Sequence, residues 1–394
     1  MLYSKLPVMT SEKILLKDIL FNKPKVVKIA SEIASVYPSF KQESFIREVI
    51  SKFPDLELKA RIAWIAECLR SYLPSDYCYA VDILLQSLPE PNNPTLSDGD
   101  FGDFIYAPHA EFVAKNGCTK NDLDFSLKAL REMTVRFSAE DAILYFINPF
   151  PEGTLHQLLN WCEDPHYHVR RLCSEGTRPR LPWSQKMMIP ITSPLPILDK
   201  LFSDSTRFVT RSVANHVNDL SKIDPDLALE LLIKWRKSGK QNSQEMDYIV
   251  RHSLRTLIKQ GHPKAMQLLG FSHSARVTVS NFTVPKSVKI NTALEFSFTV
   301  QAQENTDIIV DYILYFQNKL GKLNSKKVFK FKTMALKKGQ PITLSKRHLL
   351  RQFMTTRTLY AGCHEIALQI NGKTYARGSF ELYAFSRVEK EVVS

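Results

Sequence analysis

The sequence predicts a protein with two domains of different class, an all-α helical solenoid followed by an all-β sandwich. Its 394 residues exceed what one hydrophobic core usually organises. Apolar residues recur at helical spacing through the first 270 residues, and the composition switches near Phe271 to short β-rich segments. We expect the helical domain to span residues 1–272 and the sandwich 276–386, with a tail over 387–394.

The clearest helical pattern lies between residues 56 and 73. Its apolar side chains recur every three or four residues and therefore share one face of a helix: Leu58, Ile62, Ile65, Leu69 and Leu73. A Pro-Ser break follows, and a second helix is expected over 76–88. Residues 90–102 are rich in Pro, Asn, Asp and Gly, so we expect a loop there.

Two later segments, 161–175 and 201–215, repeat one another at an offset of 40 residues. The aligned positions are Asp164 with Asp204, Val169 with Val209, and Arg171 with Arg211. A weaker third copy lies at 246–257. A period of about 40 residues is typical of HEAT repeats, which cannot bury their apolar faces singly and therefore stack into a solenoid. We expect the Asp of each unit to cap the helix that follows it.

The C-terminal part alternates apolar and polar residues, as half-buried strands do. The expected strands are 277–284, 293–301, 307–317, 327–333, 362–370 and 374–383. Six or seven short strands in about 110 residues are typical of an immunoglobulin-like sandwich. Cys363 is the one cysteine of this region, which excludes the intersheet disulfide of antibody domains.

The net charge of +13 is concentrated towards the C-terminal end. Residues 276–394 carry +11 and the first 275 residues carry +2, which favours a polyanion such as DNA as the partner. The alternative is that the charge only keeps the domain soluble. The candidate phosphate contacts are Lys326, Lys327, Lys330 and Lys332. Alternation along a strand predicts that Lys330 and Lys332 share one face, and an ordinary solvated face is the alternative.

Several classes of protein are excluded or disfavoured. No apolar run approaches the roughly 20 residues of a membrane helix, and no signal peptide is recognisable, so we expect a cytoplasmic protein associated with the nucleoid. The six cysteines form no CxxC pair and have no His at zinc spacing, so we expect buried reduced thiols and no metal. Phosphate-binding loops, dinucleotide-binding fingerprints, HExxH and local nucleophile signatures are absent, and no cofactor is expected.

The densest candidate site is the stretch 169–183, VRRLCSEGTRPRLPW. Arg171 and Glu175 are four residues apart and so share a face of a helix that we expect to end at Gly176. The alternative is a plain helical ion pair. Arg178 and Arg180 follow in an extended loop, where they would contact phosphates or the last carbonyls of the helix. Trp183 would face sugar or bases, or would belong to the core.

A second candidate lies at 138–146. Glu140 and Asp141 fall in the first turn of an expected helix, with Ser138 as its cap. Acids in a first turn also stabilise the helix dipole, which is the structural alternative.

At these residues the sequence resembles the AlkC branch of the AlkC/AlkD alkylpurine DNA glycosylases. The matching stretches begin at Leu56, Phe137, Trp161, Asp204 and Gly261, and those at Trp161 (WCEDPHYHVRRLCSEGTRPRLPW) and Asp204 (DSTRFVTRSVANHVNDLSKIDPD) are long and specific. Some members of the family add a C-terminal immunoglobulin-like domain, as the β-rich part of this chain predicts. After Glu140, however, family members often continue FAIRPF, whereas this chain has Asp141 and then AILYF.

The resemblance implies a solenoid that wraps damaged duplex DNA and hydrolyses the N-glycosidic bond of small cationic lesions such as 3-methyladenine. It implies active-site roles for Glu140, Arg171 and Glu175, on a concave surface without a deep base pocket. The chemistry agrees, because a cationic base leaves without protonation and the reaction needs negative charge near the developing oxocarbenium sugar and a positioned water.

We expect a monomer that contacts the DNA backbone through Arg178, Arg180, Arg211 and the lysines of the sandwich. The alternative function is a non-catalytic HEAT-repeat scaffold that binds nucleic acid or protein. Convergence of Glu140, Glu175 and Arg171 on one surface would favour the enzyme.

Overall fold

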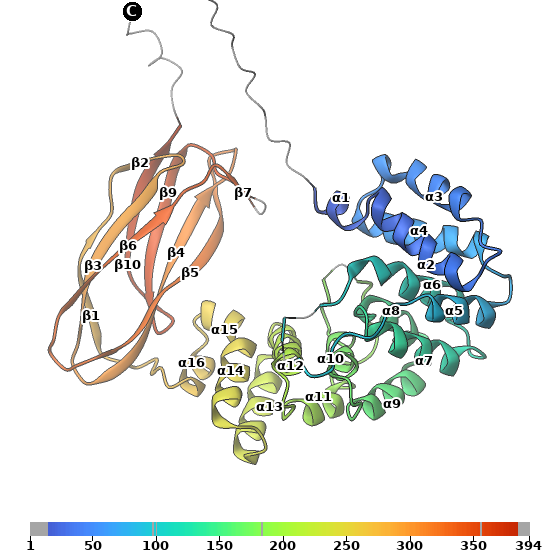
Figure 1. Cartoon of the computed structure of the whole chain (residues 1–394). Helices are drawn as coiled ribbons and strands as arrows, with labels where there is room; N and C mark the ends of the chain where they lie inside the picture. The colour runs from blue at the N-terminus through green and yellow to red at the C-terminus, as the bar shows by residue number, and fades with distance from the viewer. Residues whose placement is uncertain (1–14, 97, 100, 183, 355–356, 385–394) are drawn as a thin grey trace, which may run out of the picture. The chain divides into compact units, whose positions relative to one another are not determined.

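The structure, a computed structural model, describes residues 15–96, 98–99, 101–182, 184–354 and 357–384. Helices precede strands along the chain, which confirms the predicted order of an all-α and an all-β part (Figure 1). The expected tail, 387–394, and Trp183 lie outside the described residues. Among the residues described, no helix combines the length and the apolar character needed to cross a membrane.

The α-helices are α1 Leu16–Leu20, α2 Lys23–Val36, α3 Gln42–Ser51, α4 Leu58–Tyr72, α5 Tyr77–Gln86, α6 Ala107–Asn116, α7 Leu123–Thr134, α8 Glu140–Ile147, α9 Pro151–Trp161, α10 Tyr167–Glu175, α11 Leu195–Leu201, α12 Arg207–Leu220, α13 Pro225–Ser238, α14 Ser243–Ser253, α15 Arg255–Lys259 and α16 Pro263–Leu268. Short 3-10 helices span Phe53–Asp55 and Phe104–Tyr106. The expected helices at 56–73 and 76–88 are α4 and α5, and Ile65 and Leu69 of α4 are fully buried as the pattern predicts.

Contacts group the chain into two compact units. The first comprises residues 1–220 and 233–252, and the second comprises 221–232 and 253–394. Helices α15 and α16 therefore pack with the strands that follow them. Gly261 and Gly372 make this possible, because both have positive φ (74° and 81°) and a Cβ on either would meet the other's backbone within 2.8 Å.

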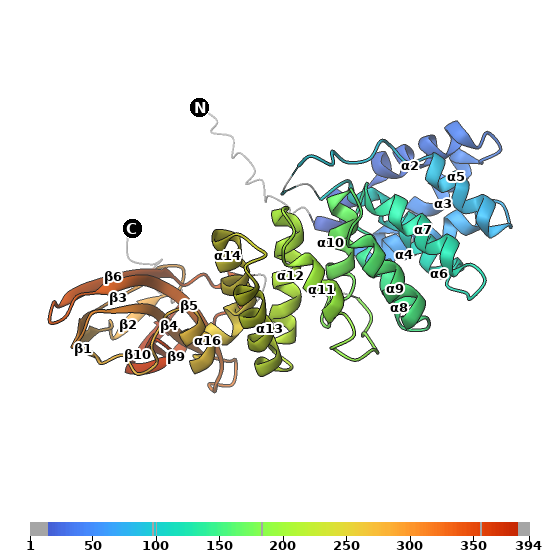
Figure 2. The ribbon, with the colours of Figure 1, turned by 90° about the horizontal axis from the view of Figure 1, so that it is seen from below.

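In the first unit, successive helices stack on one another as a repeat protein requires. Helix α10 contacts α9, α11 and α12, and Figures 1 and 2 both show these helices side by side. The repeat positions Val169, Val209 and Val250 are all fully buried, so the valines of the 40-residue pattern are core residues.

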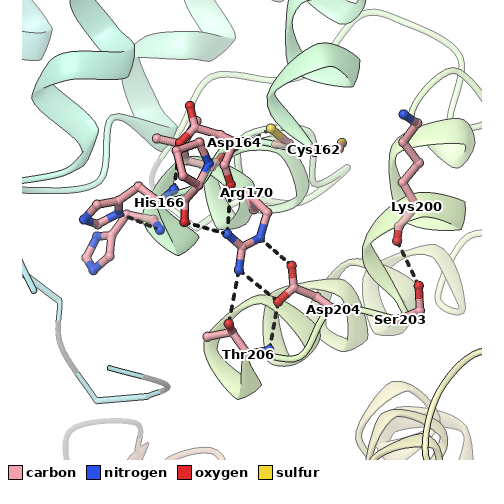
Figure 3. A network of polar contacts seen from close by, with 12 residues as sticks. Cys162, Asp164, His166, Arg170, Lys200, Ser203, Asp204 and Thr206 are labelled. Atoms are coloured by element: carbon pink, nitrogen blue, oxygen red, sulfur yellow. Dashed lines mark hydrogen bonds and ion pairs between the residues drawn. The ribbon is translucent and has the colours of Figure 1, made fainter. Parts of the chain in front are cut away.

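Each repeat is tied to the next by an arginine and an acid. Arg131 of α7 donates to Asp164 through Nε (3.0 Å) and Nη2 (3.1 Å). One repeat later, Arg170 of α10 donates to Asp204 through Nε (2.6 Å) and Nη2 (3.2 Å), as Figure 3 shows. Arg207 of α12 continues the series by pairing with Glu245 of α14. These pairs fix the register of adjacent repeats.

The expectation that Asp164 caps α10 is wrong. The N-cap is His166, whose side chain accepts the N–H of His168. Asp164 lies two residues earlier and accepts the N–H of His166 at 2.8 Å. Asp204 accepts the N–H of Thr206 in the same way. Both acids therefore form the turn before a helix, while an arginine of the preceding repeat donates to both of their oxygens.

The second unit contains a β-sandwich with two main sheets. Its strands are β1 Val277–Thr283, β2 Ser287–Lys289, β3 Ala293–Ala302, β4 Thr306–Gln317, β5 Leu323–Leu336, β6 Ile342–Leu349, β7 Phe353–Met354, β8 Arg357–Thr358, β9 Gly362–Ile370 and β10 Lys373–Tyr383. The sheet orders are β1-β3-β6 and β2-β10-β9-β4-β5, and β7 and β8 form a small hairpin. All six expected strands are present, whereas β2, β6, β7 and β8 were not predicted.

The expectation that Lys330 and Lys332 share one face of a strand is wrong. Lys330 pairs with Asp311 of β4 and Lys332 pairs with Val310, its neighbour, because a bulge interrupts the register. Consecutive residues of a strand face opposite sides, so the two lysines oppose residues of opposite faces. The strand that carries them is an edge of its sheet, where lysines also discourage pairing with other chains.

Another expectation fails at the cysteines. Cys68, Cys162 and Cys173 are buried, but Cys363 on β9 is exposed. No disulfide is formed by any of the six thiols, all of which are described.

We predict that the Arg170–Asp204 pair stabilises the solenoid. The side chains are 16% and 6% exposed, so Arg170→Met would leave a buried carboxylate without its counter-charge. The free energy of unfolding should fall by about 3 kcal/mol in urea denaturation. Lys200→Ala is the control, because its partner Glu163 is 76% exposed, and the loss of stability should be much smaller than that of Arg170→Met. Equal effects of the two substitutions would contradict the assignment.

Candidate active site

The site is built on α10, which carries two of the three predicted catalytic residues. The helix ends at Glu175 with Gly176 as its C-cap, as predicted. A Cβ at Gly176 would meet Ile143 of α8 at 2.4 Å, so glycine allows α8 to pack closely against the end of α10. This packing brings the start of α8, with Glu140, towards the polar face of α10.

Arg171 links carboxylates from two helices. Its Nη1 donates to Oε2 of Glu140 at 2.8 Å, and its Nη2 lies 3.7 Å from Oε2 of Glu175. The guanidinium also lies over the ring of Phe208 of α12, 4.6 Å from the ring centroid. The planar group is thus held by two anions and one aromatic face, a combination that lysine could not satisfy.

Ser138 has a different role from the predicted one. The N-cap of α8 is Ala139, which has no side-chain cap, so the expectation that Ser138 caps this helix is wrong. Instead its hydroxyl donates to Oε2 of Glu140 at 2.5 Å and accepts from Nη1 of Arg171 at 3.0 Å. Ser138 therefore fixes the Glu140 carboxylate against the arginine.

Glu175 is deeply buried, with 5% of its surface exposed. Oε1 accepts from Nη1 of Arg178 at 2.6 Å, and Oε2 accepts from the hydroxyl of Ser212 at 2.7 Å. Arg178 in turn donates to Oδ2 of Asp219 through Nε and Nη2, at 2.9 and 2.6 Å. Three segments of the chain therefore converge on one carboxylate: α10, the turn that follows it, and α12.

The arginines decide the charge of Glu175. Burial acts to raise the pKa of this carboxyl, but the positive charges of Arg171 and Arg178 and the hydrogen bond from Ser212 outweigh it, so the net pKa is lowered. Burial acts to lower the pKa of Arg171, and the carboxylates of Glu140 and Glu175 raise it overall. Glu175 and Arg171 are therefore both ionised at neutral pH.

Glu140 is the more accessible of the two carboxylates. Its side chain is 29% exposed, against 7% for Glu175. A cavity of about 140 Å³ borders it, with Phe104, Phe137 and Asp141 among the lining residues. Asp141, the acid that follows Glu140, pairs with Lys59 at 2.7 Å and accepts from Ser184 at 2.5 Å. Its charge is therefore compensated by partners other than those of Glu140.

The predicted backbone contacts lie in different settings. Arg180 is exposed, whereas the side chain of Arg178 is 10% exposed and engaged by Glu175 and Asp219. Arg211 of α12 forms an ion pair with Asp98. The lysines of β5 are exposed, and they belong to the second unit: Lys326, Lys327, Lys330 and Lys332.

Sequence reasoning did not find four residues of the cluster around Arg171, Glu140 and Glu175. They are Ser212, Phe208 and Asp219 of α12, together with Ser138 in its role as a partner of Glu140. The available signal was the repeat itself, because Phe208 and Ser212 flank Arg211, the repeat equivalent of Arg171. The part of the chain that the structure describes contains no cluster of His, Cys, Asp or Glu arranged to hold a metal ion.

Comparisons with known proteins extend over both parts of the chain. A family model for the uncharacterised protein YhaZ, C-terminal Ig-like domain, matches residues 278–384. The uncharacterized protein YhaZ of Bacillus subtilis (strain 168) is 31% identical over 363 residues, covering 91% of this chain and 96% of that protein. A solved structure of the Pseudomonas fluorescens alkylpurine DNA glycosylase AlkC, bound to DNA containing an abasic site analog, matches with a TM-score of 0.84 and 32% identity, covering 94% of this chain and 99% of that chain. These matches confirm the expected immunoglobulin-like domain and the resemblance to AlkC.

We predict that the contribution of Glu175 to stability depends on pH. At pH 7 the variant Glu175→Gln should be less stable than the wild type by about 3 kcal/mol, because two arginines lose a buried counter-charge. Since the pKa of Glu175 is lowered in the folded protein, this contribution is present above pH 4.5 and is lost as the pH falls through the folded-state value. The difference in unfolding free energy should therefore narrow below pH 4.5, which urea denaturation at several pH values measures. A difference that widens on acidification would contradict the ionised cluster.

Proposed function

Because the chain belongs to the family of YhaZ and the alkylpurine DNA glycosylase AlkC, we propose that it is a DNA glycosylase for alkylated bases. The proposed reaction is hydrolysis of the N-glycosidic bond of small cationic lesions, of the 3-methyladenine class, in duplex DNA. The observation that carries the proposal is Arg171, which holds the carboxylates of Glu140 and Glu175 together on adjacent helices.

The leaving group explains why the site needs no general acid. A purine alkylated on a ring nitrogen is already cationic, so the bond between base and sugar breaks without prior protonation, and the base departs neutral. Positive charge then develops on the sugar, and a fixed carboxylate stabilises it. Glu175 meets this requirement because Arg171 and Arg178 keep it ionised despite its burial.

The nucleophilic water is assigned to Glu140. Within the described residues, the hydrogen bonds to this side chain go to Oε2, from Ser138 and Arg171, which leaves Oε1 to accept from a water. The adjoining cavity of about 140 Å³ has charged groups in its lining and exceeds the volume of one water. Glu140 therefore orients the water, and Glu175 contributes fixed negative charge.

The DNA backbone is proposed to lie against Arg180 and Arg211 and, through the β-sandwich, against the lysines of β5. Arg178 is reassigned from a phosphate contact to a positioning residue, since both of its carboxylate partners are buried. The protein is further proposed to act as a monomer, in the cytoplasm and on the nucleoid.

The first test is single-turnover release of free base from methylated duplex DNA. The wild type should release 3-methyladenine, and Glu140→Gln and Glu175→Gln should each lower the rate by at least about 100-fold, because each removes negative charge that acts in the transition state. Both variants should still bind DNA. Glu163→Gln, which changes an exposed carboxylate outside the cluster, should leave the rate unchanged.

Two outcomes would contradict the proposal. If the wild type bound duplex DNA and released no base, the chain would be a scaffold and the cluster would be structural. If base release survived in both carboxylate variants, the reaction would not depend on the cluster.

The β5 lysines make a separate prediction. Replacing Lys326, Lys327, Lys330 and Lys332 by Gln should weaken DNA binding and flatten its dependence on salt, by about 0.9 in the logarithmic slope for each lysine that contacts a phosphate. A variant in which the exposed Lys41 and Lys120 are replaced is the control and should keep the wild-type slope. An unchanged slope in the β5 variant would show that this strand does not contact DNA.

A further inference from the structure

The segment 89–103 connects α5 to the helices of the next repeat, and its ends are fixed to the chain just before α8. Near one end, the N–H of Asn92 donates to the carbonyl of Val135 at 2.8 Å, and the Asn92 carbonyl lies 3.0 Å from Nε2 of His166. Near the other, Gly102 forms an antiparallel bridge with Phe137. The segment is therefore anchored near both of its ends.

Glycine is required at position 102. Its φ is +73°, and a Cβ there would fall 1.8 Å from the carbonyl oxygen of Arg136. This close approach fixes the direction in which the chain leaves Phe137, and so the position of Phe101, the residue before it.

From this anchor the segment reaches α12. The ring of Phe101 meets the ring of Phe208 edge-on, with centroids 5.3 Å apart, and Asp98 pairs with Arg211 one turn along the helix. Figure 2 shows the chain between α5 and α6 passing the end of α10 towards α12. Phe208 is also the ring that lies under the guanidinium of Arg171. Two successive contacts, of 5.3 and 4.6 Å, therefore join Phe101 to the candidate active site.

Phe101 keeps much of its ring in water despite this contact. It is 55% exposed, and Leu96 in the same segment is 43% exposed. A core phenylalanine would be covered, as Phe208 is at 3% exposure. The segment thus holds a large apolar side chain in solvent, next to the ring that supports Arg171. In the same segment, the charge of Asp98 is offset by Arg211 of α12.

We propose that Phe101 is a wedge residue that enters the base stack of duplex DNA at the damaged step. Proteins that deform DNA insert exposed apolar side chains between bases, and the surrounding stack compensates by contact with the inserted ring. The ring of Phe208 supports Phe101 from behind. The inference rests on the proposed function in taking damaged duplex DNA as the ligand. The insertion of Phe101 does not require that the protein release a base.

The test uses the full-length chain and a duplex with a tetrahydrofuran abasic site flanked by 2-aminopurine. Insertion unstacks the reporter base, so the wild type should raise its fluorescence. Phe101→Ala should abolish this rise and weaken binding to the abasic duplex about 10-fold, with binding to undamaged duplex unchanged. Phe101→Trp should restore the rise. Tyr79→Ala, which removes an aromatic side chain of similar exposure (52%) on α5, should behave as the wild type.

The proposal is overturned if the wild type gives no fluorescence rise, or if Phe101→Ala gives the same rise as the wild type. It is also overturned if Phe101→Ala weakens binding to damaged and undamaged duplex equally, since Phe101 would then contribute only to binding that does not depend on damage. These readouts involve no base release. If the wild type released no base but still unstacked DNA through Phe101, the proposed glycosylase activity would be refuted and the proposed insertion of Phe101 would stand.

Discussion

The burial of the Glu175 carboxylate between α10 and α12 is the constraint on which the candidate site depends. A carboxylate with 5% exposure is unfavourable unless charges and hydrogen bonds replace its water, and here Arg171, Arg178 and Ser212 replace it. These partners come from different segments, so the site forms only when two repeats have packed. Because Glu175 needs Arg171 as a counter-charge, it fixes the position of this arginine, which also binds Glu140. The position of the accessible Glu140 carboxylate therefore depends on the buried Glu175 carboxylate.

Arginine and acid pairs also join adjacent repeats outside the candidate site. Comparing these pairs with the contacts of Arg171 distinguishes structural arginines from the arginine of the proposed active site. Arg170 and Arg171 are consecutive in α10 but act in different directions. Arg170 binds Asp204 and sets the register of the next repeat, as Arg131 does one repeat earlier. Arg171 instead faces Glu140 and Glu175. One turn of α10 therefore supplies both the contact between adjacent repeats and the central arginine of the proposed active site.

The sequence predicted features that depend on local geometry, and it missed those that depend on packing. The spacing of Arg171 and Glu175, the helix end at Gly176 and the buried valines of the repeat follow from helical periodicity. The contacts of Ser138 with Arg171 and of Ser212 with Glu175 could not be assigned, because each joins residues more than 30 positions apart. A strand bulge, which has no simple sequence signature, separated Lys330 from Lys332. The support that Phe208 gives to Arg171 likewise arises only from the stacking of α10 and α12.

The central claim is that an ionised Glu175 acts in the reaction, and the pH dependence of single-turnover base release tests it most directly. The lowered pKa of this buried carboxyl predicts a rate that stays constant as the pH falls from 7 towards 5 and declines only below the ordinary glutamate value of 4.5. A rate that already declines between about pH 6 and 7 would contradict the claim, because the essential carboxylate would then have a raised pKa and the two arginines would not control its charge.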